Sequence, residues 1–180
     1  MPFDVGAVLA EAESFGFTSV GELNTGAMIF DPSVRDMCTP ENCNKYDHSW
    51  KCPTACESVE VLAERARQYP YGVIVQTTAE LEDDFDFETM GGTYEKHEKN
   101  FAAWIACLRA EGVDILPLGA DTCGICKECT YPGAPCRFPE LAVSPAEAYG
   151  LVVSQLCQVS GMKYNYGRGT ITYTGFCLIK

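Results

Sequence analysis

A run of three cysteines, each separated from the next by two residues, is the strongest chemical signal in the chain, and a fourth cysteine follows after six intervening residues. These cysteines are Cys123, Cys126, Cys129 and Cys136, with Pro139 just beyond. Such a triple can wrap around an iron–sulfur cube and reach three irons, while the more distant thiolate closes the fourth corner. Zinc ligands usually come as two separated pairs, so the third cysteine step favours a [4Fe–4S] cluster over zinc.

A second cysteine group lies earlier in the chain and spans nineteen residues. Its members are Cys38, Cys43, Cys52 and Cys56. All four can face one ion or cluster, and Pro53 directly follows a candidate ligand, as at many cluster cysteines. A helix predicted to begin at Ser58 would direct its N-terminal dipole at an anionic cluster. This spacing is less specific and also fits zinc, and His48 within the loop is an alternative ligand, although a loop histidine beside the cluster is the simpler interpretation.

The total of eleven cysteines favours metal ligation over disulfides. The first seventeen residues lack a basic region and carry three acids, which is not typical of a signal peptide. We therefore expect a cytoplasmic protein, whose reducing surroundings keep thiols free or bound to metal. The remaining cysteines, Cys107, Cys157 and Cys177, lie in apolar stretches and are expected to be small core residues.

The charge balance limits the classes of partner. The formal net charge is −12, which argues against nucleic acid and anionic membrane surfaces, because binding phosphates needs clustered Lys and Arg. No apolar run of about 18 residues predicts a membrane span. The acidic run over 80–88 could dock a basic redox partner protein, or could simply be a solvated loop. The sequence leaves the oligomeric state open.

Hydrophobic periodicity and turn residues predict an alternating order of helices and strands in one domain, 1–180. The predicted helices span 3–15, 58–69, 94–111 and 144–160, and the predicted strands span 19–23, 26–30, 71–78, 113–120 and 169–179. The last helix is expected to begin at a capping box formed by Ser144 and Glu147, with Pro145 at its first position. This order favours an α/β fold with a mostly parallel sheet and helices packed on it. Both cysteine-rich loops, 38–56 and 123–139, are then expected at the carboxyl edge of the strands.

Two segments of the chain resemble the predicted metal-binding family called domain of unknown function 2284. They are VRDMCTPENCNKYDHSWKCP (34–53) and GADTCGICKECTYPGAPCRFPELAVSPAEAYG (119–150). The resemblance implies metal binding, with iron–sulfur clusters expected, in anaerobic prokaryotes, and implies no settled activity. Seven of the eight loop cysteines match the family's pattern, and Cys56 is the exception. The resemblance therefore implies that Cys56 is an optional ligand or the neighbour of an open iron site.

The leading hypothesis is an iron–sulfur protein with two [4Fe–4S] clusters that acts in electron transfer or as an accessory redox protein rather than as a catalyst. One alternative is a redox or Lewis-acid enzyme, in which an iron without a protein thiolate binds substrate. A second alternative is a structural protein in which zinc holds the loops together. The cysteines alone leave the three hypotheses open.

Overall fold

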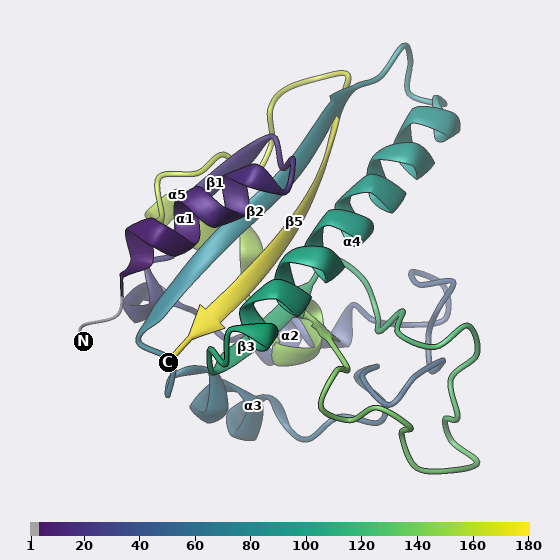
Figure 1. Ribbon diagram of the computed structural model, residues 1–180. Helices are drawn as coiled ribbons and strands as arrows, with labels where there is room; N and C mark the ends of the chain where they lie inside the picture. The colour runs from purple at the N-terminus through teal and green to yellow at the C-terminus, as the bar shows by residue number, and fades with distance from the viewer. Residues whose placement is uncertain (1–3) are drawn as a thin grey trace.

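Two ten-residue strands, β2 (Tyr71–Glu80) and β5 (Thr170–Ile179), pair along their whole length at the centre of the sheet (Figure 1). The computed structural model describes residues 4–180. Strand β1 (Ser19–Glu22) adds to β2, β3 (Ile115–Gly119) adds to β5, and the two-residue β4 (Ser144–Pro145) lies at the edge beside β3. The strand order is therefore β1-β2-β5-β3-β4.

The sheet is mixed but mostly antiparallel, so the predicted mostly parallel sheet is wrong. Among the strand pairs of residues 4–180, only β3–β4 is parallel. Strands β2 and β3 do run in the same direction, since each is antiparallel to β5, and the helix between them is the expected crossover. The last strand of the chain inserts between them, and hydrophobic periodicity carries no information on that position.

Helices α1 (Val5–Ser14) and α4 (Phe87–Ala110) cover one face of the sheet (Figure 1). Alternate residues of the central strands, such as Val73 and Val75, point to this face, as the period-2 geometry of a strand requires. They pack against a helical stripe of α4 that includes Trp104 and Leu108. The acidic run between β2 and α4 lies at the N-terminal end of α4 (Figure 1).

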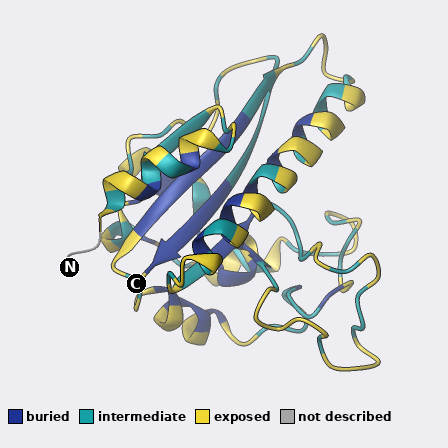
Figure 2. Cartoon of the chain, in the orientation of Figure 1, coloured by how far each residue is buried: buried dark blue, intermediate teal, exposed yellow. Residues whose placement is uncertain are grey.

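The other face of the sheet is covered by shorter elements. These are α3 (Val59–Ala66), the 3-10 helix η2 (Ala146–Tyr149) and α5 (Val153–Val159). Ile74 and Phe176, which alternate with the residues of the first face, pack here against Leu62 and Leu156. As predicted, α3 begins after Ser58, whose hydroxyl accepts a hydrogen bond from the Val61 N–H. Figure 2 shows that burial is concentrated in the sheet and in the helix sides that touch it.

Several predicted elements differ from the observed ones. The predicted helix 3–15 is α1, although residue 3 lies outside the described residues. The predicted strand 26–30 is wrong: η1 (Thr25–Ala27) occupies its first residues, Phe30 forms an isolated β-bridge with Leu151, and the short helix α2 (Pro32–Asp36) follows. Helix α4 begins at Phe87, earlier than predicted, after an Asp86 cap.

The predicted helix 144–160 is also wrong in its first half. The chain forms β4 and η2 there, and α5 begins only at Val153. Gly150 separates the two parts with a left-handed φ of 68°. A Cβ at this position would lie 2.7 Å from the Asp31 carbonyl oxygen, so the close approach of two backbone segments interrupts the helix.

Between residues 4 and 180 no helix combines the length and the apolar composition that a membrane span needs.

Candidate metal centres

Two cysteine-rich loops lie side by side near the β3–β4 edge of the sheet and beside α4 (Figure 1). The loop over 120–143 leaves the carboxyl end of β3, as expected, and returns to β4. The loop over 37–58 connects α2 to α3 and follows no strand, so its predicted origin at a strand end is wrong. Figure 2 shows both loops as mostly intermediate or exposed, in contrast to the buried sheet, although Ser49 and Cys52 of the earlier loop are buried.

The cysteines of the later loop come together. Cys123, Cys126, Cys129 and Cys136 all line one small cavity. Two turns shape the return of the chain: the Ala134 N–H donates to the Thr130 carbonyl at 2.9 Å, and the Thr130 hydroxyl donates to the Pro135 carbonyl at 2.9 Å. We call this cavity the four-cysteine site.

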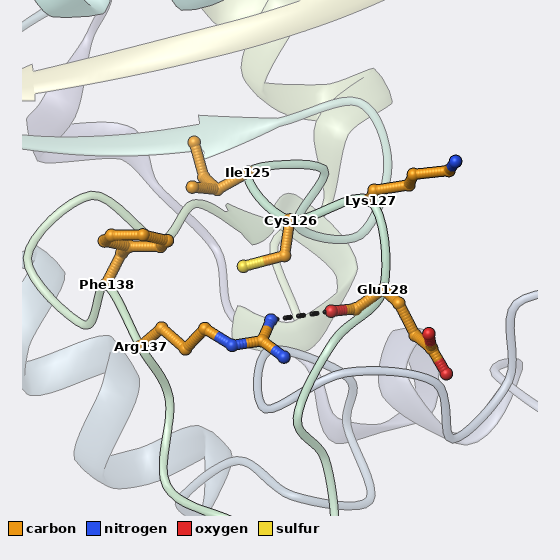
Figure 3. A pocket seen from close by; sticks show the side chains of 6 residues that line it. All are labelled: Ile125, Cys126, Lys127, Glu128, Arg137 and Phe138. Atoms are coloured by element: carbon orange, nitrogen blue, oxygen red, sulfur yellow. Dashed lines mark hydrogen bonds between the residues drawn. The ribbon is translucent and has the colours of Figure 1, made fainter.

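Basic side chains border the four-cysteine site. Lys51 and Arg137 line the same cavity as the cysteines. Figure 3 shows Arg137 beneath Cys126, in a hollow with exposed Phe138 at its rim, and its guanidinium donates to the Glu128 carbonyl at 2.9 Å. Two cations beside four thiols suit a centre that carries net negative charge.

Three cysteines of the earlier loop line a separate cavity of about 240 Å³. They are Cys38, Cys43 and Cys52. Backbone turns hold them: the Cys38 N–H donates to the Arg35 carbonyl at 3.0 Å, and the Cys43 N–H donates to the Thr39 carbonyl at 2.9 Å. We call this cavity the three-cysteine site.

The thiols of the three-cysteine site affect one another electrostatically. Burial, together with the neighbouring Cys43 and Cys52, raises the pKa of Cys38 to about 11. Three thiolates in one cavity repel one another, and a bound cation would remove that repulsion. Thiolates are the ligands that zinc, copper(I) and iron–sulfur clusters select, so the donor set fits a soft metal centre.

Cys52 is the most deeply placed of these three cysteines, with 3% of its surface exposed. Burial alone would raise its pKa, but hydrogen bonds from the Ser49 and Thr122 hydroxyls and from the backbone outweigh burial and lower the pKa. The two hydroxyl oxygens lie 3.4 and 3.3 Å from the sulfur and 2.6 Å from each other. Thr122 belongs to the later loop, so the two cysteine loops together surround this sulfur.

Cys56 does not join the other three. Its sulfur donates to the Lys51 carbonyl at 3.2 Å, and its side chain packs against the core under α3. Burial raises the pKa of its thiol. The Arg35 guanidinium donates to the carbonyls of Pro53, Cys56 and Glu57, which fixes this segment of backbone. Cys56 does not line the cavity that its three predicted partners line, although the charge of Cys52 acts on its thiol.

Side chains of one cysteine loop anchor the other. The Trp50 indole N–H donates to the Ala134 carbonyl at 3.0 Å, and its ring packs edge-on against Tyr131 at 5.0 Å between centroids. The Tyr131 hydroxyl donates to an Asp47 carboxylate oxygen at 2.6 Å. Trp50 also lines the four-cysteine site, so the earlier loop forms part of the wall of the later site.

A polar cluster links the loops to α4. Lys45 forms an ion pair with Asp121 and lies 3.1 Å from the Tyr94 hydroxyl oxygen, which donates to Asp121 at 2.7 Å. Burial opposes the charge on Lys45, but the hydrogen bonds to Asp121 and Tyr94 outweigh it and raise the pKa of its ammonium group. Lys45 and Asp121 also line the three-cysteine site, where they could hydrogen-bond a ligand.

The other candidate ligands lie elsewhere. His48 is exposed, and its Nδ1 lies 2.6 Å from the Tyr46 carbonyl oxygen. Cys157 and Cys177 are fully buried core residues, as expected. Cys107, predicted to be a core residue, is only half-buried.

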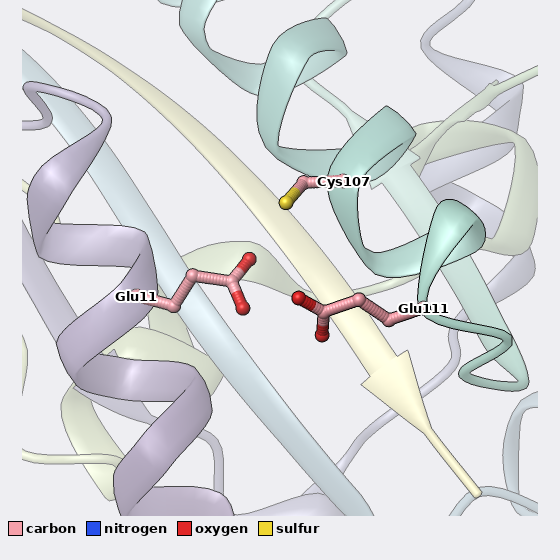
Figure 4. A group of neighbouring side chains, drawn as sticks. All are labelled: Glu11, Cys107 and Glu111. Atoms are coloured by element: carbon pink, nitrogen blue, oxygen red, sulfur yellow. The ribbon is translucent and has the colours of Figure 1, made fainter.

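Cys107 instead belongs to a small group of possible metal donors between α1 and α4. Its sulfur and carboxylate oxygens of Glu11 and Glu111 all lie within 4.8 Å of one another (Figure 4). Burial and the charge of Glu111 raise the pKa of Glu11. Glu11 and Glu111 are 100 positions apart, and the one local signal is the helical i,i+4 spacing of Cys107 and Glu111, so sequence reasoning missed the group.

Comparison with known proteins identifies a family. The model of a family described as predicted metal-binding protein, DUF2284, matches residues 21–179, which include both cysteine loops. No curated protein and no solved structure matches the chain.

Proposed function

The chain belongs to the DUF2284 family of predicted metal-binding proteins, and we propose that it is an iron–sulfur protein with two [4Fe–4S] clusters, one at each cysteine site. The observation that carries the proposal is the convergence of Cys123, Cys126, Cys129 and Cys136 on one cavity. Lys51 and Arg137 border it and would balance the negative charge of a cluster. Cys38, Cys43 and Cys52 would hold the second cluster. When bound, such clusters accept and donate single electrons.

The spacing of the cysteines along the chain supports clusters over single zinc ions. Three cysteines at two-residue steps, closed by a fourth, are typical of [4Fe–4S] sites, whereas zinc ligands usually come as two separated pairs.

Clusters held by these cysteines would serve in electron transfer or in an accessory redox role. We expect them in a reducing compartment such as the cytoplasm, where thiols stay free to bind metal. Exposed Ile125 and Phe138 at the rim of the four-cysteine site would bring a redox partner protein close to that cluster. The acidic run over 80–88 lies at the N-terminal end of α4. Tyr94, about 9 Å further along this helix, donates a hydrogen bond to Asp121 of the three-cysteine site, so a basic partner docked on the acidic run would lie near that site.

Anaerobic purification with iron, sulfide and zinc quantified per chain tests the proposal. We expect about eight irons and eight sulfides per chain and broad absorption near about 400 nm. Cys126→Ala should lose about half of the iron, whereas Cys107→Ala, outside both sites, should keep all of it. Stoichiometric zinc without sulfide would refute the proposal and establish the structural zinc alternative.

One observation favours a second candidate function, that of an enzyme with an open metal position. Cys56 lies outside the cavity that Cys38, Cys43 and Cys52 line, so the three-cysteine site supplies three thiolates. Lys45 and Asp121 line the same cavity and would orient a substrate there by hydrogen bonds.

Two matched variants separate the enzyme from a closed electron carrier. If the site is open, Cys56→Ala should keep the full iron content, while Cys52→Ala should lose the cluster of the three-cysteine site. Loss of that cluster in Cys56→Ala would show that Cys56 is a ligand and would favour a closed electron carrier.

A further inference from the structure

A further cavity lies between α4 and the later cysteine loop, beside the candidate metal centres. Its volume is about 550 Å³, within the range of small-molecule sites in proteins. One wall is a continuous stripe of α4 at helical spacing, and the other is formed by 121–125 with Leu141 and Val143. The helical stripe consists of Tyr94, Glu95, Glu98, Phe101, Ala102, Ile105, Ala106 and Arg109.

The middle of the cavity is apolar and open. Phe101 and Ile105 are buried beneath it, while Ala102 and Ala106 are exposed and leave room that larger side chains would fill. Leu141 on the opposite wall is also exposed, at 42% of its surface. Apolar surface of this kind is stabilised when a ligand covers it.

The two ends of the cavity differ in charge. Arg109 lies at one end, where its guanidinium donates to the Leu141 carbonyl at 3.2 Å and, within residues 4–180, forms no ion pair. Burial lowers the pKa of Arg109, although the nearby Glu140 partly opposes the shift. A guanidinium has five N–H donors in a planar fork that matches a carboxylate, so most of this donor capacity is available to a ligand.

The opposite end is acidic. Glu98 and Asp121 line it, and one Glu98 carboxylate oxygen is buried without a hydrogen-bond partner among the described residues. From Glu98 to Arg109 the helix rises about 16 Å, eleven residues at about 1.5 Å each. Acidic groups at this end would repel a carboxylate and accept a hydrogen bond from a donor group, which would fix the direction of a bound molecule.

We propose that this cavity binds a small, mostly apolar carboxylate, with its acid group on Arg109 and its apolar body on Phe101, Ala106 and Leu141. The inference goes beyond the proposed clusters and does not rest on them, since none of its contacts involves a metal. Asp121 and Thr122 line both this cavity and the three-cysteine site, so a ligand here would lie next to that centre.

Equilibrium dialysis of the purified, metal-loaded protein tests the proposal with two probes of the same skeleton. We expect 4-phenylbutanoate to bind, and 4-phenylbutylamine to bind at least about tenfold more weakly, because the amine cannot pair with Arg109. Arg109→Gln should weaken binding of the carboxylate about tenfold and remove the preference between the two probes. Equal binding of both probes to the unaltered protein, or no binding of the carboxylate at about 10 mM, would overturn the proposal.

Two alanine variants on the same helix locate the site. Ala106→Leu fills the cavity and should abolish carboxylate binding, whereas Ala103→Leu, also exposed on α4 but outside the cavity, should leave it unchanged. Equal effects of the two variants would refute this location. Iron is quantified in every variant. Absence of iron from the unaltered protein would refute the clusters and leave the binding result intact, whereas full iron without carboxylate binding would refute the cavity proposal alone.

Discussion

His97 makes the stability of the fold depend on pH in a direction that can be measured. Its side chain is fully buried, with Nδ1 3.0 Å from the Thr77 hydroxyl oxygen. The ring stacks on Phe101 at 6.0 Å between centroids and meets the edge of Phe17 at 5.8 Å. The described residues provide no partner for its Nε2 atom. Burial therefore lowers the pKa of His97 from 6.5 to about 4.

The sign of the effect follows from the two pKa values. The folded protein holds His97 neutral, whereas the unfolded chain binds a proton below pH 6.5, so acid stabilises the unfolded chain. The contribution to stability is complete above pH 6.5 and is lost as the pH falls to about 4. Between pH 7 and pH 5 the loss is about 2 kcal/mol, and the full shift corresponds to about 3 kcal/mol.

The assay compares urea unfolding of the unaltered protein and of His97→Asn at pH 7, 6 and 5. Asparagine cannot be protonated, so the free-energy difference between the two proteins should shrink by about 2 kcal/mol from pH 7 to pH 5. Glu98→Gln is a matched control with the opposite trend. Burial raises the pKa of Glu98 to about 7, so the unaltered protein should gain stability over this variant as the pH falls.

Nuclear magnetic resonance of the histidine ring provides a direct check. We expect the His97 ring nitrogens to stay in the neutral form at pH 5. Protonation of His97 near pH 6.5, or a free-energy difference that does not change with pH, would refute the reasoning.

Three further perturbations test particular contacts. Gly150→Ala should lower the free energy of unfolding by at least about 2 kcal/mol in urea unfolding, because its φ is left-handed and a Cβ would lie 2.7 Å from the Asp31 carbonyl oxygen. Gly161→Ala, with a similar φ and open space around it, should cost about half as much. Trp50→Phe removes the hydrogen bond to Ala134 and should speed iron loss to a chelator severalfold. Trp104→Phe, in the core, should change the free energy of unfolding and leave the rate of iron loss unaltered. Thr122→Val removes a hydroxyl 3.3 Å from the Cys52 sulfur. This variant should lower the reduction potential of the cluster proposed at the three-cysteine site, since hydrogen bonds to cluster sulfurs raise the reduction potential. An unchanged potential would show that the hydroxyl does not act on this centre.

The sequence predicted most of the elements because the apolar residues of each repeat at the period of a helix or a strand. It did not predict which strands are neighbours. Strand β5 lies between β2 and β3, and this placement depends on how the whole chain closes around two cores. The break at Gly150 has a similar cause, since the backbone of Asp31, more than a hundred residues away, forces it.

The spacing of cysteines along the sequence predicted which thiols lie together better at the four-cysteine site than at the three-cysteine site. Two-residue steps bring thiols together by local geometry alone, and the four cysteines do line one cavity. The wider gaps around Cys43 and Cys52 leave the path of the chain undetermined. Cys56 was grouped with them by proximity in sequence, but its thiol donates to the Lys51 carbonyl and packs on the core. Which residues ligate metal stays a prediction.

Each cysteine loop contributes a side chain to the site of the other loop, so metal loading of the two sites should be coupled. Trp50 and Thr122 each contribute to a centre that the other loop mainly builds. The loss of chain entropy on ordering these loops is therefore common to both centres. Whichever centre is loaded first orders backbone that the other also needs, so the second should be loaded with higher affinity. When the metal is scarce, chains should be either empty or complete, with few half-loaded molecules.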